Sequence, residues 1–180
     1  MHSQNSLGRS RPLGLPSSLS DGAYVSRCAL AGRSAFIYAV RERSVGALYI
    51  GQTCNPNGAL GRLAQHLSWD TDSNTFRRRV LAVFRIDEIE LENVELIAIP
   101  LPDESRYQSA ARDYREAIES LVHDHVLEAL TLAGGAAGLV LVSRAYRHPY
   151  RKDEEVISLA RRVGNEICGW ITNMDTTSHG

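Results

Sequence analysis

The apolar residues near the first third of the chain fall into two short runs of strand-forming residues. The run S-A-F-I-Y-A-V covers residues 34–40, and the run A-L-Y-I-G covers residues 47–51. Both contain aromatic and β-branched side chains, and a polar stretch that ends in glycine separates them. This pattern predicts a β-hairpin.

The turn of the predicted hairpin decides which residues face each other. We expect it to be centred on Arg43 and Ser44, which pairs Tyr38 directly with Tyr49 on one face of the sheet. A register that differs by one residue would put the two tyrosines on opposite faces.

Two helices are expected after the hairpin. The sequence C-N-P-N-G after Thr53 is typical of a turn, and apolar residues then recur at helical spacing. These residues are Ala59, Leu60, Leu63 and Leu67. The first helix begins near Asn57 and carries Arg62 and His66, four residues apart, on one side. The second is expected over residues 75–85.

The second half of the chain predicts two more strands and two long helices. A strand is expected over residues 94–100, and a long helix over residues 109–130 that the glycines at 134–135 would end. A strand over residues 139–146 and a final helix over residues 153–171 would follow.

Together these elements describe an α+β protein, with a small antiparallel sheet of about three strands flanked by helices. We expect a core over residues 34–130 and a C-terminal strand–helix extension over residues 131–180, packed on the core or at a dimer interface. Residues 1–20 are rich in Ser, Pro, Gly and Asn, which predicts a flexible tail.

Composition and charge narrow the class of protein. The 180 residues contain no apolar run long enough to span a bilayer and no secretory signal pattern, so we expect a cytoplasmic protein without a membrane span. The cysteines, Cys28, Cys54 and Cys168, form no C-x-x-C pair and are expected to be small buried thiols.

The net charge of −1 conceals an asymmetry between the two halves of the chain. Residues 1–85 hold eleven arginines and four acids, a net +7, whereas residues 86–180 hold nine basic residues and seventeen acids, a net −8. Unless the halves neutralise each other, the basic half predicts a surface that attracts a polyanion.

Three motifs follow one another in the first half. They are F-I-Y at residues 36–38, Y-I-G at residues 49–51 with Q-T after it, and G-R-L-A-Q-H at residues 61–66. The set resembles the GIY-YIG nuclease superfamily, and the resemblance covers about residues 34–126. It departs from the pattern at Phe36, where the family has glycine, and in lacking the polar residue, often Asn, that commonly follows the family's Glu-bearing helix.

The resemblance implies a one-metal phosphodiesterase. Tyr38 would help to activate the attacking water, and Tyr49 would support it or order the site. Arg62 would hold the scissile phosphate, with His66 as a further catalytic candidate. Glu119, in the long helix, would ligate a divalent ion, Mg²⁺ or Mn²⁺.

The chemistry of these residue types suits the implied reaction. A free tyrosine has a pKa of about 10, so Tyr38 acts as a base only if Arg62 or the metal favours the phenolate, and otherwise it orients water. Arginine makes bidentate contacts with phosphate, so lysine should not replace Arg62 well.

Each assignment also has a purely structural interpretation. Tyr38 and Tyr49 would then be strand aromatics that pack across the hairpin, and His66 a neighbour of the helix end. Glu119 would be a solvated helix acid. Because Glu119 lies at the edge of the buried stripe, we favour it as the ligand over Glu116.

Two further basic stretches are candidate contacts for nucleic acid. The arginines at 77–79 could follow a phosphate backbone, or form a solvated helix face. The stretch 144–152 interleaves cations with aromatic residues, which suits phosphate contact and base stacking, or forms an exposed loop with packed tyrosines. The H-D-H sequence at 123–125 is rejected as a metal site, since residues two apart on a helix point apart. The residues assigned to nucleic-acid binding are Gly51, Arg77, Arg78, Arg79, Arg144, Tyr146, Arg147, Tyr150 and Arg151.

The leading functional expectation is a divalent-metal-dependent DNA endonuclease, of a restriction, defence or repair type. With little chain outside the core, a homodimer would let it cut both strands. The alternative is a GIY-YIG-like module that has lost cleavage and binds nucleic acid or protein.

Overall fold

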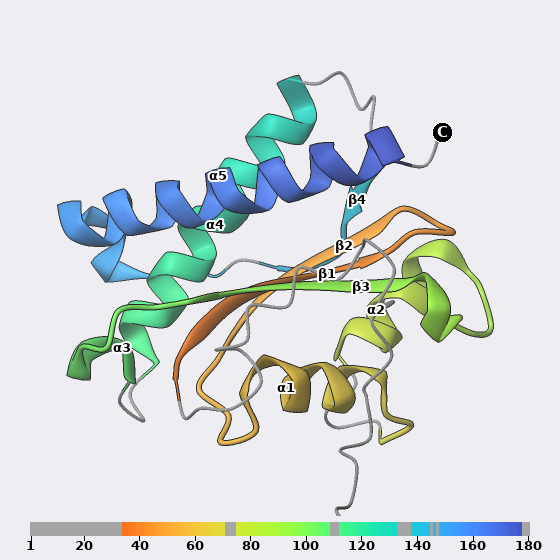
Figure 1. Ribbon diagram of the computed structural model, residues 1–180, viewed down its shortest axis with the longest axis horizontal. Helices are drawn as coiled ribbons and strands as arrows, with labels where there is room; N and C mark the ends of the chain where they lie inside the picture. Colours follow the sequence, from red (N-terminus) through yellow and green to blue (C-terminus); the bar gives the residue numbers. More distant parts are fainter. Residues whose placement is uncertain are drawn as a thin grey trace, which may run out of the picture.

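The computed structural model describes residues 34–70, 75–108, 112–132, 138–144, 146 and 148–177. The predicted tail at residues 1–20, Cys28, the glycines at 134–135 and Arg147 lie outside the described residues. Within the described residues the fold is α+β, as predicted: a mixed sheet with helices on both faces (Figure 1).

The sheet has four strands in the order β3-β1-β2-β4. Strand β1 (Phe36–Glu42) lies between β2 (Ala47–Thr53) and β3 (Val94–Pro100), and both pairings are antiparallel. The short strand β4 (Val140–Leu141) adds a parallel edge beside β2, so the sheet is mixed rather than purely antiparallel.

The predicted hairpin register is wrong by two residues. Tyr38 faces Gly51, and Tyr49 faces Val40. The cause is a longer turn, because Glu42 accepts hydrogen bonds from the Ser44 hydroxyl (2.7 Å) and the Val45 N–H (2.9 Å), and Gly46 adopts a φ of +70°. Since the shift is even, both tyrosines stay on the same face.

The helices have the bounds α1 (Gly58–Leu67), α2 (Thr75–Phe84), α3 (Ser105–Gln108), α4 (Asp113–Leu132) and α5 (Glu154–Thr177), with 3₁₀ turns η2 (Leu91–Asn93) and η3 (Pro149–Lys152). The short helix α3 was not expected from the sequence. The other four correspond to the predicted helices, and the Asp153 carboxylate caps α5 by accepting the N–H groups of Glu155 and Val156.

The strand predicted over residues 139–146 is confined to two residues. Beyond them the Val142 N–H still donates to the Leu48 carbonyl at 2.8 Å, but the Ile50 N–H donates to the hydroxyl of Ser143. The side chain of Ser143 thus satisfies the next donor of β2, and the chain leaves the sheet there. In the described part of the chain, β4 pairs with β2 only at Ala47 and Leu48.

Alternation along the strands divides the core in two. Ile37, Ala39 and Leu48 face α4 and α5, whereas Phe36 and Tyr38 face α1 and α2. Figure 1 shows α5 crossing α4 on one side of the sheet, and α1 and α2 on the other. The extension thus packs on the core through Val156, Leu159, Val163 and Ile167. None of the described helices is long and apolar enough to cross a membrane.

Candidate active site

Tyr38 and Tyr49 lie side by side on the α1 and α2 face of the sheet. Their rings are nearly parallel, with centroids 6.3 Å apart, and both side chains are buried. Gly51 makes room for them, because a Cβ added there would overlap the Tyr38 hydroxyl and crowd the Tyr49 ring. The space beside Gly51 is thus filled by the two tyrosines, whereas the sequence led us to expect an approaching nucleic acid there.

His66 holds the Tyr38 hydroxyl from α1. The backbone N–H of Phe76 donates to Nδ1 of His66 (3.2 Å), and Nε2 lies 2.6 Å from the Tyr38 oxygen. A neutral imidazole that accepts at Nδ1 carries its proton on Nε2. Burial, with the charges of Arg62 and Arg79, lowers the pKa of His66 to about 3. His66 is therefore neutral and donates to Tyr38.

Arg62 lies one helical turn before His66, on the same side of α1. Its guanidinium donates to Oε1 of Gln65 at 3.0 Å and hydrogen-bonds to Tyr38. Burial raises the pKa of Tyr38 well above its usual value, and the Tyr49 phenol adds to the rise. Arg62 acts against both effects, since its charge and its hydrogen bond favour the phenolate.

Glu119, on α4, belongs to the same site. Its charge raises the pKa values of Tyr38 and Tyr49, so the carboxylate lies within electrostatic range of both. Burial, with the neighbouring Glu116 carboxylate, raises the pKa of Glu119 to about 8 against the charges of Arg79 and Arg62.

Arg79 belongs to this site, although the sequence pointed to a surface role with Arg77 and Arg78. It lies with its guanidinium carbon 5.6 Å from the centre of the Tyr49 ring, and it donates to the Val142 carbonyl at 3.3 Å. Its charge acts on Tyr49, His66 and Glu119. The signal in the sequence was its spacing of three from the core residue Phe76, which puts both on one side of α2.

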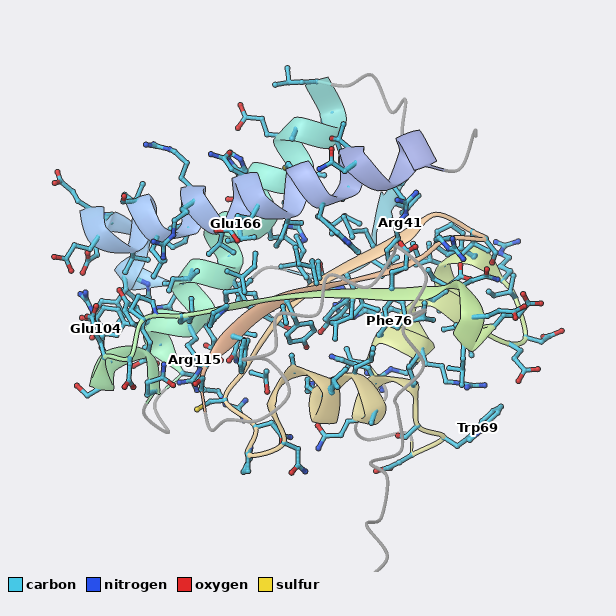
Figure 2. All side chains as sticks on the ribbon, in the orientation of Figure 1. Arg41, Trp69, Phe76, Glu104, Arg115 and Glu166 are labelled. Atoms are coloured by element: carbon cyan, nitrogen blue, oxygen red, sulfur yellow. The ribbon has the colours of Figure 1, made fainter. Side chains whose placement is uncertain are left out.

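The arginines at 77–79 do not share one surface. Arg77 is buried with its guanidinium carbon 3.5 Å from the centre of the Trp69 ring, whereas Arg78 is exposed. Figure 2 shows Trp69 projecting outward from the end of α1. Only Arg78 matches the solvated helix face considered from the sequence.

The residues of the basic stretch after β4 also differ in exposure and packing. Arg144 and Tyr146 are exposed, the latter by 74%. The ring of Tyr150 stacks on Tyr114 with centroids 4.3 Å apart, and Arg151 pairs with Asp124. Tyr150 is therefore a packed tyrosine, and Tyr146 has the exposed ring that base stacking needs.

The metal site implied by the resemblance has one carboxylate at its centre, Glu119, with Glu116 on the same side of α4. Among the described residues there is no group of three or more His, Cys, Asp or Glu side chains placed to hold a metal ion. Mg²⁺ usually keeps several waters and binds one or two carboxylates together with substrate phosphates. The Glu119 carboxylate, with the Glu116 carboxylate near enough to act on its pKa, fits such an ion.

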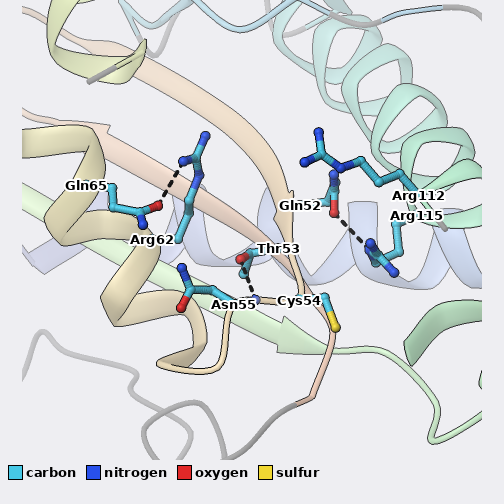
Figure 3. A pocket seen from close by; sticks show the side chains of 8 residues that line it. All are labelled: Gln52, Thr53, Cys54, Asn55, Arg62, Gln65, Arg112 and Arg115. Atoms are coloured by element: carbon cyan, nitrogen blue, oxygen red, sulfur yellow. Dashed lines mark hydrogen bonds between the residues drawn. The ribbon is translucent and has the colours of Figure 1, made fainter. Parts of the chain in front are cut away.

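A polar cleft opens beside the tyrosines. It has a volume of about 520 Å³, and Arg62 is one of its lining residues. The others are Gln52, Thr53, Cys54, Asn55, Gln65, Arg112 and Arg115. Figure 3 shows Arg62 and Gln65 on one wall and Arg112 and Arg115 on the other. Sequence reasoning did not single out these last two arginines.

No family model, curated protein or solved structure matches this chain. The functional argument therefore stands on the geometry of the site, together with the motif resemblance described above.

Proposed function

We propose that this protein is a divalent-metal-dependent endonuclease that hydrolyses phosphodiester bonds in DNA. The observation that carries the proposal is the convergence of Tyr38, Tyr49, Arg62, His66 and Glu119. These side chains come from β1, β2, α1 and α4, yet they contact one another or act on one another electrostatically. A buried cluster of this kind with strongly perturbed pKa values is typical of a functional site.

In this proposal Tyr38 acts as a base in its phenolate form: it first releases its own proton to solvent and then takes the proton of the attacking water. Its oxygen accepts hydrogen bonds from His66 and Arg62, and both donors stabilise the phenolate that must form. His66 does not itself take the proton from Tyr38, because its Nε2 already carries one. His66 is thus a positioning residue, and Tyr49 orders the site through its contacts with Tyr38 and His66.

Arg62 binds the scissile phosphate, because it lines the cleft and also touches the proposed base. Arg79 adds a second permanent positive charge beside Tyr49. Glu119 would hold the metal, which when bound supplies positive charge for the phosphoryl oxygens and the leaving oxygen. Both arginines act on charge that increases in the transition state.

A nicking assay tests the proposal. Supercoiled plasmid should become open circular in the presence of Mg²⁺ or Mn²⁺, and EDTA should abolish the conversion. Absence of nicking with either ion, by protein that still binds the plasmid, would instead support the second candidate, a binding module without cleavage. The arginine-lined cleft favours that second candidate, because cations suffice to bind a polyanion.

A further inference from the structure

The face of α4 that carries Glu119 also carries Arg115, four residues earlier, and Arg112 immediately precedes the helix. The Glu116 N–H donates to the Arg112 carbonyl, so Arg112 joins the first turn of α4, and we call Arg112, Arg115 and Glu119 the stripe. Seven residues separate the first and last of them, which corresponds to about 10 Å along the helix axis. The stripe thus connects the proposed metal ligand to a pair of cations.

The two arginines face Arg62 across the cleft. Arg115 is buried and held by neutral acceptors, with Nε donating to Gln52 at 2.9 Å and Nη1 to the Tyr107 carbonyl at 2.7 Å. Arg112 is exposed at the rim of the same cleft. Among the described lining residues there is no carboxylate. Cations from α1 and α4 therefore converge on one polar space (Figure 3).

Like charges in this space oppose one another. Burial lowers the pKa of the Arg115 guanidinium and the charge of Arg112 also lowers it, although Cys54 and Glu116 act in the other direction. An anion bound between Arg112 and Arg115 would offset this repulsion. Planar guanidinium groups suit a phosphate particularly well, because each can donate two parallel hydrogen bonds.

We propose that the cleft is a second phosphate subsite, in which Arg112 and Arg115 hold the DNA strand on one side of the bond that is cut. The proposal rests on the nuclease function, since it takes Arg62 as the site of the scissile phosphate. Arg62 lines one wall of the cleft and Arg112 and Arg115 the other (Figure 3), so the second phosphate would be a neighbour of the scissile one on the same strand. Glu119 and Arg112 would then act on different phosphates of the same strand.

Binding of a fluorescein-labelled DNA duplex in EDTA tests the subsite without cleavage. Arg112→Ala should weaken binding about tenfold at low salt and reduce the slope of log affinity against log salt by about 1, which is the loss of one phosphate contact. Arg112→Lys should restore most of the slope. Arg161→Ala, which removes an exposed arginine on α5 outside the cleft, should change neither quantity.

An Arg112→Ala protein with the affinity and salt slope of the unsubstituted protein would overturn the subsite. Nicking assays on the same preparations separate this failure from failure of the nuclease proposal. If plasmid is nicked but Arg112→Ala binds normally, the nuclease stands and the subsite is wrong. If plasmid is not nicked but the Arg112 effect on binding is seen, the cleft binds phosphate and the nuclease proposal is wrong.

A neutral phosphate analogue locates the contact along the strand. Single methylphosphonate groups, placed one at a time near the mapped cut, should weaken binding most at one position beside the scissile phosphate. Arg112→Ala should remove that position's penalty and leave the penalties at other positions. Equal penalties in the two proteins at every position would contradict the proposal.

Discussion

The Tyr38 oxygen lies 2.6 Å from Nε2 of His66, and His66 is the donor in this hydrogen bond. The direction follows from the other ring nitrogen, which accepts the backbone N–H of Phe76. The first turn of α2 therefore fixes the tautomer of a residue on α1, which in turn orients a tyrosine on β1. Residues of α2, α1 and β1 thus together determine the hydrogen bonding of the proposed base, Tyr38.

His66 should make stability depend on pH in a defined window. Its folded-state pKa of about 3 lies below the ordinary value of 6.5, so the unfolded state binds more protons between these values. The stabilisation from neutral His66 is present above pH 6.5 and decreases as the pH falls towards 3. At pH 5 the loss is about 2 kcal/mol.

Urea unfolding of the wild type and His66→Gln at pH 5 and pH 8 measures this effect. The stability advantage of the wild type over the variant should be about 2 kcal/mol smaller at pH 5. Glu119 has the opposite pH dependence, because its raised pKa makes the folded state bind the extra proton, but it is common to both proteins. An advantage that is the same at the two pH values would contradict the lowered pKa and the neutral state assigned to His66.

Glu119→Gln should retain DNA binding and lose metal-dependent cleavage, since the amide keeps the shape and removes the charge. Because burial raises the pKa of Glu119 to about 8, metal binding must displace a proton below that pH. The affinity for Mn²⁺, measured by calorimetry, should therefore rise with pH up to about 8. Glu116→Gln is the matched control on the same side of α4. If Glu116→Gln abolishes cleavage and Glu119→Gln does not, the wrong acid has been assigned.

Arg79→Ala should slow cleavage about tenfold, equivalent to about 1.4 kcal/mol of transition-state stabilisation. The reason is the loss of a permanent positive charge beside Tyr49 and Glu119. Arg79→Lys should recover part of the rate because it keeps the charge. The neighbouring exposed Arg78, replaced by alanine, provides the control. Equal single-turnover rates for Arg79→Ala and Arg78→Ala would exclude Arg79 from the site.

Gly51→Ala should displace the Tyr38 and Tyr49 side chains. The added methyl group overlaps the Tyr38 hydroxyl, which must move away from His66, and overpacking of this kind costs about 1–3 kcal/mol. We expect a lower melting temperature together with a large loss of nicking. An alanine variant with unchanged nicking would show that the position of the tyrosine pair is less critical than the packing indicates.

The local patterns predicted most of the fold and the central residues of the site. Strand β3 has the predicted bounds, and Arg62 and His66 share a side of α1 as their spacing of four requires. The sequence correctly predicted that Tyr38 and Tyr49 share one face of the sheet, but not the register of the β1–β2 hairpin. The longer turn depends on the Glu42 carboxylate, whose hydrogen bonds leave no periodic signal in the sequence.

The parts of the site that the sequence did not predict depend on tertiary contacts. Arg79 enters the site because residues 142–143 lie along β2 and supply the Val142 carbonyl. Arg115 lines the cleft because Gln52 and the Tyr107 carbonyl hold its guanidinium. Arg79 and Val142 are 63 residues apart in the sequence, and so are Arg115 and Gln52. Helical spacing alone therefore cannot identify these contacts.

The most direct test of the central claim is the single-turnover rate of Mg²⁺-dependent plasmid nicking by the wild type and Arg62→Ala. Arg62 lines the cleft and touches Tyr38, so its loss should lower the rate by about 10²–10³-fold, while a half-buried helix residue costs the fold little. Arg62→Lys should be nearly as slow. Nicking by the wild type that EDTA abolishes and Arg62→Ala lacks is the predicted result. Nicking by Arg62→Ala at the wild-type rate would contradict the proposed active site.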